Sequence, residues 1–388
     1  MRSVLWLSSW YPNAADPYTG DFIKRQAEAV SVVQPLKIIY SGKYPKAPQQ
    51  QPGSTMGAFP NLQEIMLYYP STAKNNIISR VRSLFTYFRK HADFIRQLKN
   101  KNELPDIVHV QVAFKAGLIA LYLKWKYRIP YVLTEHWTGY YQEAKDSLFN
   151  SSFVEKYLTR LVLKNAAMLI TVSEALGNQI QQHWIRIPFR KIPNVVDTHL
   201  FYHQENRRVR KFRFIHISTL LYQKNPEGII RAFTALVKEG MDSDLLLVGP
   251  VNPGLEKMIA DSGLPLNTIL CTGEISYEQV GVELRNASAM ILFSFYENMP
   301  CVVLEALCTG IPVIATRVGG IPEVIGNENG ILIDAGDEKA LLKAMRTIIQ
   351  NEPVFNKEQI SAQATACFSY ETITKEILAV YDLVLKNS

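Results

Sequence analysis

The stretch FRFIHISTLLYQKNPEGIIRAFTALVKEGMDSDLLLVGP, residues 212–250, decides the fold class. It consists of an apolar run at 212–218, an amphipathic segment at 225–240 and a second apolar run at 244–250. A strand, a helix and a strand in this order form a βαβ unit, in which the two strands run parallel. The sequence therefore predicts an α/β fold with a parallel sheet.

The same alternation continues after residue 250. Apolar runs predict further strands, with amphipathic helices between them, at 268–274, 289–294, 312–316 and 330–334. Asn225 followed by Pro226 is a helix start, with proline at the first helical position. Ser276 and Gln279 have the spacing of a capping box, and Asp337 is placed to cap a later helix. We therefore expect a sheet covered by helices on both faces.

Residues 1–200 show the alternation less cleanly. Strands are expected at 3–9, 35–41, 106–111, 131–136 and 168–173, and helices at 20–33 and 153–166. A chain of 388 residues exceeds the roughly 250–300 residues at which a single core stops growing. We therefore predict two doubly wound domains, residues 1–205 and 206–369, with a boundary near residue 205, where polar and basic residues interrupt the apolar pattern.

The charge is distributed unevenly along the chain. Residues 1–200 hold 25 Lys and Arg against 13 Asp and Glu, whereas the remainder holds 17 against 22. A basic half is suited to nucleic acid, a phosphorylated substrate or an anionic membrane. No RNA-binding, zinc-finger or helix-turn-helix motif supports nucleic acid as a partner. The segment 75–101 has apolar residues at helical spacing and a basic opposite face, which fits either a helix packed on the first domain or peripheral attachment to anionic membrane.

The chain resembles a cytoplasmic protein in two respects. No apolar run approaches the roughly 18 residues that span a bilayer. The four cysteines have no C-x-x-C spacing and lie in or beside apolar segments, so we expect reduced, buried thiols and no zinc site.

Two glutamates stand near the predicted end of the strand at 289–294. In a parallel α/β sheet, ligands bind outside the carboxyl ends of the strands. We expect Glu297 in the strand-to-helix loop, Pro300 at the first helical position and Glu305 inside the helix. The first N–H groups of that helix, from Cys301 to Val303, would bind a phosphate. A carboxylate beside a phosphate is suited to accept hydrogen bonds from neutral hydroxyls, and a sugar offers several.

The stretch SFYENMPCVVLEALCTGIPVIATRVGGIPEVI, residues 294–325, resembles a family signature. Two glutamates separated by seven residues, a small-residue turn, a Pro-Val-Ile strand and a Gly-Gly-x-Pro-Glu loop are similar to the retaining glycosyltransferases of family 4, the group 1 nucleotide-sugar transferases with the GT-B fold. The segments SSWYPNAADPYTGDFIKRQAEAV, TEH, KIPNVVD and the closing FSYETITKEILAVYDLVL extend the resemblance over nearly the whole chain. It implies two Rossmann-like domains facing across a cleft, with residues of about 370–388 packing back on the first.

The resemblance also implies roles for individual residues. Glu297, His136 and Lys224 are the catalytic candidates: Glu297 binds the donor sugar, His136 lies at the reacting sugar, and Lys224 clamps the diphosphate. Glu305 would bind the ribose hydroxyls. The further donor-binding candidates are Gly20, Ile275, Asn298, Met299, Cys301 and Val302.

Simpler structural roles stand beside these. Lys224 can be a surface lysine, His136 a core histidine and Gly20 a turn glycine. Where the family commonly has Gly-Arg, the chain has Ser218 and Thr219, so the arginine of the phosphate clamp is missing.

From these observations we expect a metal-independent retaining glycosyltransferase without a cofactor. It would move a sugar from a UDP- or GDP-linked donor to a glycan or lipid-linked acceptor, in bacterial surface polysaccharide synthesis, in the cytoplasm or on the inner face of the membrane. No nucleic-acid partner is expected. The alternatives are a nucleotide-sugar epimerase or phosphorylase of the same fold, and a degenerate protein that binds the nucleotide sugar without turnover.

Overall fold

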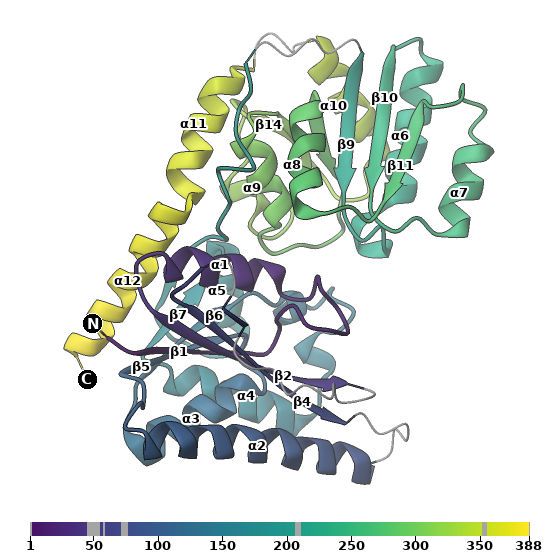
Figure 1. The fold of residues 1–388 in the computed structure, drawn as a ribbon. Coiled ribbons are helices and arrows are strands. Elements are labelled where there is room, and N and C mark those ends of the chain that lie inside the picture. The colour runs from purple at the N-terminus through teal and green to yellow at the C-terminus, as the bar shows by residue number, and fades with distance from the viewer. Residues whose placement is uncertain are drawn as a thin grey trace. The chain divides into compact units, whose positions relative to one another are not determined.

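The computed structural model describes residues 2–44, 55–56, 59–70, 77–205, 211–350 and 355–387. The chain forms two compact units, drawn in Figure 1. The first comprises Met1–Val172, Gly177–Val195 and Ile373–Ser388, and the second comprises Ser173–Leu176 and Val196–Thr372. The chain thus changes unit at Val195–Val196, before the boundary expected near residue 205. Residues 206–210 of the expected linker lie outside the described residues.

The first unit is built on an eight-stranded sheet in the order β3-β4-β2-β1-β5-β6-β7-β8. All neighbours pair in parallel except β3, which is antiparallel to β4. The strands are β1 (Val4–Ser8), β2 (Leu36–Tyr44), β3 (Thr55–Met56), β4 (Leu62–Pro70), β5 (Ile107–Gln111), β6 (Tyr131–Glu135), β7 (Met168–Thr171) and β8 (Phe189–Lys191).

Helices cover both faces of this sheet. Figure 1 shows α2, α3 and α4 on one side and α1 and α5 on the other. The helices are α1 (Asp21–Ser31), α2 (Ile77–Asn100), α3 (Ala116–Tyr127), α4 (Phe153–Asn165) and α5 (Glu174–His183). The five strands expected in this half are confirmed, as are the helices at 20–33 and 153–166.

Several elements of the first unit were not anticipated, among them β4 and α3. Strand β4 carries Gln63 and Glu64 near its start, which interrupt the apolar pattern of a strand. Helix α3, AGLIALYLKWKY, is almost continuously apolar, so it has no polar face to reveal a helical period. The reason is its position, since α3 contacts β1, β5, β6 and α4 and is therefore covered on several sides.

The second unit is built on a six-stranded, wholly parallel sheet in the order β11-β10-β9-β12-β13-β14. All six strands predicted from the sequence are confirmed. They are β9 (Phe212–Ile217), β10 (Ser243–Val248), β11 (Ile269–Gly273), β12 (Ala289–Leu292), β13 (Val313–Thr316) and β14 (Gly330–Ile333). The helices of this half are α6 (Pro226–Lys238), α7 (Pro253–Ala260), α8 (Tyr277–Asn286), α9 (Cys301–Cys308), α10 (Glu338–Gln350) and α11 (Lys357–Phe368).

The predicted helix caps are present. The Asn225 side chain accepts the Gly228 N–H at 3.1 Å, Ser276 and Gln279 form the capping box, and Asp337 accepts the Ala340 N–H at 2.9 Å. Pro300 was expected at the first helical position, but it lies one residue before it. It is the N-cap of α9, with extended backbone, and the helix begins at Cys301.

The last helix, α12 (Tyr370–Lys386), belongs to the first unit from Ile373 onward. Its Tyr381 is fully buried and accepts a hydrogen bond from Trp6 Nε1 at 2.9 Å. The same hydroxyl lies 2.7 Å from His109 Nδ1. These bonds join the C-terminal helix to β1 and β5.

The four cysteines are free thiols, but the expectation that they are buried is wrong for two of them. Cys271 lies on the edge strand β11 and Cys367 in the last turn of α11, and both side chains are exposed. Cys301 is half-buried and Cys308 is buried. None of the described helices combines the length and the apolar character needed to cross a membrane.

Candidate functional site

The order of the second sheet places its ligand site. Strand β9 lies at the centre, with β10 and β11 to one side and β12, β13 and β14 to the other. The chain adds β10 and β11 on one side of β9 and then crosses back to add β12 on the other side, so the order of the strands reverses between β9 and β12. Ligands of open α/β sheets bind at such a switch point, outside the carboxyl ends of the strands. Lys224 lies in the loop after β9 and Glu297 in the loop after β12.

These two loops are joined by several contacts. The Phe295 N–H donates to the Gln223 carbonyl at 2.8 Å, and Gln223 Nε2 donates to the Tyr296 carbonyl at 2.8 Å. The rings of Tyr222 and Phe295 stack with centroids 4.9 Å apart. The consequence is a fixed geometry for the residues at the ends of both loops.

Lys224 and Glu297 form an ion pair at this junction, from Nζ to Oε1. The lysine side chain is 18% exposed and the glutamate 6%. The sequence suggested a role at the diphosphate for the first and at the sugar for the second. The structure brings them into direct contact, which the sequence did not predict.

A third loop, after β13, supports the loop that carries Glu297. The Gly320 N–H donates to the Asn298 carbonyl at 2.8 Å. Gly319 has φ +53°, and a Cβ there would lie 2.1 Å from the Glu297 carbonyl oxygen. Only glycine fits that position, because any side chain would collide with backbone. The Gly-Gly pair was visible in the sequence, but its contact with Glu297 was not.

Glu305 lies inside α9, where it is buried. Its Oε1 accepts a hydrogen bond from the Tyr277 hydroxyl at 2.9 Å. Tyr277 is the first residue of α8, and the half-buried Ile275 precedes it in the turn after β11. The candidate residues for ribose and base are thus connected through Tyr277, which sequence reasoning missed.

The start of α9 differs from the expected phosphate site in one donor. The Val303 N–H bonds to the Pro300 carbonyl at 3.1 Å, so it is used within the helix. Cys301 and Val302 form the first turn, at the positive end of the helix dipole. Asn298 and Met299 are buried in the preceding loop.

Ser218 occupies the place of the missing Gly-Arg pair. Its Oγ accepts the Leu220 N–H at 2.9 Å and lies 2.8 Å from His216 Nε2. His216 Nδ1 donates to the Ile291 carbonyl at 2.8 Å, so Nε2 is the acceptor for the serine hydroxyl. Burial lowers the pKa of His216 to about 4, so the ring is neutral near pH 7. Ser218 therefore fixes the turn after β9, while Thr219 is exposed.

His136 lies in the first unit, directly after β6. It is buried, and its Nε2 lies 2.9 Å from Gln111 Oε1, an acceptor, so Nε2 carries the proton. Burial lowers the pKa of His136 to about 3. At neutral pH the ring is therefore uncharged, and its one N–H, on Nε2, donates to Gln111.

Glu135 holds the loop that carries His136. Its buried carboxylate accepts N–H groups of Ala113, His136 and Trp137 at 3.0, 3.1 and 3.2 Å and the Tyr140 hydroxyl at 3.0 Å. Burial raises the pKa of this carboxyl. Sequence reasoning missed Glu135, although a charged residue at the end of a buried strand was a visible signal.

The candidate Gly20 and the histidine His109 of β5 both have structural roles in the first unit. Gly20 is the N-cap of α1 with φ +69°, and a Cβ there would lie 2.6 Å from the Trp10 carbonyl carbon. His109 is fully buried, with Nδ1 2.7 Å from the Tyr381 hydroxyl and Nε2 2.6 Å from Thr134 Oγ1. Gly20 is thus required by the backbone, and both ring nitrogens of His109 are used in the core.

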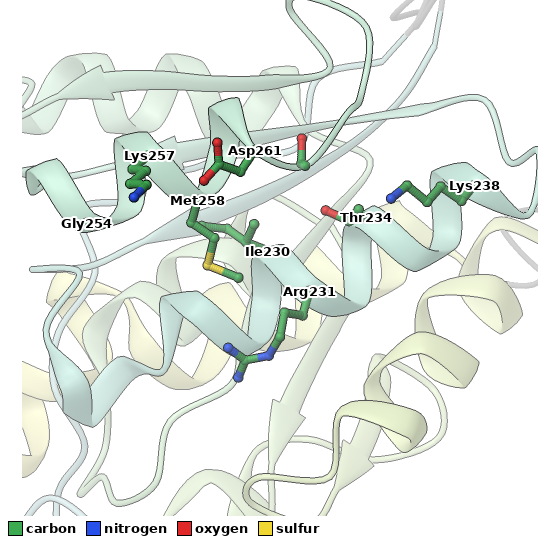
Figure 2. A pocket seen from close by; sticks show the side chains of 9 residues that line it. Ile230, Arg231, Thr234, Lys238, Gly254, Lys257, Met258 and Asp261 are labelled. Carbon is green, nitrogen blue, oxygen red and sulfur yellow. The ribbon is translucent and has the colours of Figure 1, made fainter.

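A hollow of about 500 Å³ lies between α6 and α7 on the second unit, as Figure 2 shows. Arg231, Lys257 and Asp261 are among the residues that line it. The Arg231 side chain points away from Asp261 in that view and pairs with Glu338 of α10. None of the candidate site residues lines this hollow. It is therefore a separate feature of the surface.

Comparison with known protein families matches both halves of the chain. The family described as "Glycosyl transferases group 1" matches residues 200–365, and "Glycosyltransferase Family 4" matches residues 55–200. The chain belongs to the group 1 glycosyltransferases. The resemblance inferred from residues 294–325 is thereby confirmed.

Individual relatives are distant but cover most of the chain. N-acetyl-alpha-D-glucosaminyl L-malate synthase of Bacillus anthracis is 27% identical over 74% of this chain and 77% of its own length. A putative teichuronic acid biosynthesis glycosyltransferase of Bacillus subtilis, TuaC, is 23% identical over 95% of this chain and 93% of its own. Among solved structures, HepE of Anabaena in complex with UDP-glucose has a TM-score of 0.72 at 16% identity, over 98% of this chain and all of that one. The fold is therefore that of GT-B glycosyltransferases, and the chain is a transferase by family.

Proposed function

We propose that this glycosyltransferase retains the anomeric configuration, needs no metal ion, and moves a sugar from a nucleoside diphosphate sugar to a glycan or lipid-linked acceptor. The observation that carries the proposal is the pair Lys224 and Glu297 at the switch point of the second sheet. Two relatives support it by name. TuaC is named as a putative teichuronic acid biosynthesis glycosyltransferase, and HepE was solved with UDP-glucose.

The leaving group would be stabilised by Lys224 and the first turn of α9. When the bond between the anomeric carbon and the diphosphate oxygen breaks, negative charge grows on that oxygen. A lysine and helix N–H groups aimed at it stabilise the transition state more than the ground state. The Lys224 side chain would move from Glu297 to the diphosphate, and the released carboxylate would accept hydrogen bonds from hydroxyl groups of the sugar.

The proton of the acceptor hydroxyl would leave with the diphosphate. In front-face attack, the acceptor oxygen forms the new bond to the anomeric carbon on the side from which the phosphate departs. The departing phosphate oxygen takes the acceptor's proton. The pKa of His136 is about 3, which makes the ring too weak a base to take that proton near pH 7, so it would instead orient the sugar through a hydrogen bond. Glu305 would hold the ribose hydroxyls.

Binding and turnover test this proposal separately. Thermal shift with UDP, GDP and ADP, and then with their sugars, identifies the nucleotide, because a ligand of the folded state raises the unfolding temperature. Transfer is then measured with the sugar that binds, in the presence of a chelator, and the anomer of the product is read by NMR. We expect transfer with retention. Nucleotide-sugar binding without any turnover would favour the degenerate binding protein, and an epimerised nucleotide sugar would favour the epimerase.

A further inference from the structure

Three helices of the first unit account for the net positive charge of the whole chain. Helices α2, α3 and α4 hold eleven Lys and Arg, six, two and three in turn, against Asp93 and Glu155. Their net charge of +9 exceeds the +7 of the complete sequence. The rest of the chain is therefore close to neutral, and the basic character belongs to these helices.

The three helices lie on one side of the first sheet, as Figure 1 shows. At the end of α2, Lys99 Nζ lies 5.8 Å from the ring centre of Tyr127 on α3. Between α3 and α4 there is an apolar hollow of about 450 Å³, lined by Leu118, Leu158 and Leu161 among others. The helices thus form one continuous face, which we call the basic face.

Large apolar side chains stand exposed on the basic face. Phe85 is 66% exposed, Trp125 61% and Phe153 78%. Val81 of α2 and Tyr157 of α4 are also more than half exposed. Each helix of the face contributes at least one of these side chains. Such a gathering of exposed apolar residues on a monomer marks a surface that binds a partner.

The chemistry of the face favours a membrane over nucleic acid. Aromatic side chains such as Phe85 and Trp125 could stack on bases, but the aliphatic Val81, Leu84 and Val154 are exposed beside them and offer nothing to a nucleic acid. Aliphatic and aromatic tips among Lys and Arg match an interface in which apolar groups enter the acyl boundary and cations meet phosphate headgroups.

We propose that the basic face of α2, α3 and α4 docks the protein on an anionic lipid bilayer, with Phe85, Trp125 and Phe153 inserted at the headgroup level. The proposal adds a partner to the proposed function and does not depend on turnover, because vesicle binding needs no donor.

Vesicle flotation of the full chain tests the proposal. One set of vesicles is phosphatidylcholine alone and the other contains about one third phosphatidylglycerol, where anionic headgroups attract basic segments. We expect binding to the anionic vesicles, weakened by high salt because the attraction is screened, and little binding to phosphatidylcholine alone.

Two double variants separate the apolar and ionic contributions. Phe85→Ser with Trp125→Ser removes the inserting side chains, and Arg82→Glu with Arg89→Glu reverses exposed charges of α2. Each should lower vesicle binding about tenfold or more. The matched controls lie on the second unit. Leu266→Ser changes a side chain that is 94% exposed, and Lys339→Glu with Lys343→Glu reverses exposed charges of α10; both should bind like the parent.

Three results would overturn the proposal. One is an absence of binding to anionic vesicles by the parent protein. Another is an equal loss of binding in the control variants, which would show that the effect is not specific to the basic face. The third is a different occupant: single-stranded RNA that displaces the protein from anionic vesicles, or light scattering that finds a dimer broken by the Phe85 and Trp125 substitutions.

Discussion

The ammonium group of Lys224 pairs with the carboxylate of Glu297, and this pair joins the loops that follow β9 and β12. Both side chains are largely removed from water. Loss of either partner would leave a poorly solvated charge without its counter-charge, which costs more than the pair contributes. The two residues therefore act as a unit, and each substitution must be interpreted with the other residue in mind.

Replacement of Lys224 by alanine should lower kcat/KM by roughly 10²-fold or more, because the leaving diphosphate loses a donor that acts in the transition state. The measurement is initial-rate transfer kinetics. Lys238→Ala is the matched control, since Lys238 is an exposed lysine at the far end of α6 and its removal should leave kcat/KM unchanged. A change below about threefold for Lys224→Ala would remove this lysine from the site.

Replacement of Glu305 by alanine should mainly weaken binding of the free nucleotide, because two ribose hydroxyls lose their acceptor. Calorimetric titration of each variant with the free nucleotide measures the affinity. Tyr277→Phe removes the hydroxyl that orients Glu305 and should give a smaller loss. Glu328→Ala, an exposed glutamate before β14, serves as control. Unchanged affinity in Glu305→Ala would contradict the ribose role.

The helices and strands could be predicted from the sequence wherever polar and apolar residues alternate with a clear period. The second sheet has this pattern throughout, and its caps at Asn225, Ser276 and Asp337 are local signals within four residues. Helix α3 was missed because it is buried on several sides, so its sequence lacks the polar face that reveals a helix.

The residues of the candidate site could be predicted from the sequence, but the contacts between them could not. Glu297 and Glu305 were found through their spacing around a helix start. The hydrogen bond of Tyr277 to Glu305 spans 28 positions, and the ion pair of Lys224 with Glu297 spans 73. Such contacts depend on how loops from different strands meet, which no local pattern encodes.

Gly319→Ala should destabilise the loop of Glu297 and reduce donor binding. A Cβ at Gly319 meets the Glu297 carbonyl oxygen at 2.1 Å, so the backbone must move. Gly240→Ala is a matched control, because Gly240 also has a positive φ, +89°, but has no atom within 4 Å of the new Cβ. Backbone strain of about 1 kcal/mol is common to both variants. Nucleotide-sugar affinity should fall only for Gly319→Ala, and equal affinities would show that the contact with Glu297 is unimportant.

The stability of the first unit should fall as the pH drops below the pKa of an unfolded histidine, about 6.5. Burial lowers the pKa of His109 and His136 to about 3 and that of His91 to about 4. Between these values and about 6.5 the unfolded chain binds more protons than the folded one, so each lowered pKa removes stability as the pH falls. At about pH 5 the loss is about 2 kcal/mol for each of these histidines. Glu135 titrates in the opposite sense, since burial raises its pKa, but it is one group against three.

Tryptophan fluorescence can follow this unfolding selectively, because all five tryptophans lie in the first unit. Urea titrations at about pH 7 and about pH 5 should show a clearly lower midpoint at the acid pH. His183→Gln is the control, since His183 is exposed on α5 and its replacement should leave the difference in midpoint unchanged. An equal midpoint at both pH values would mean that the pKa values of the three buried histidines are not lowered in the folded state. The argument that His136 is too weak a base to take the acceptor's proton would then fail.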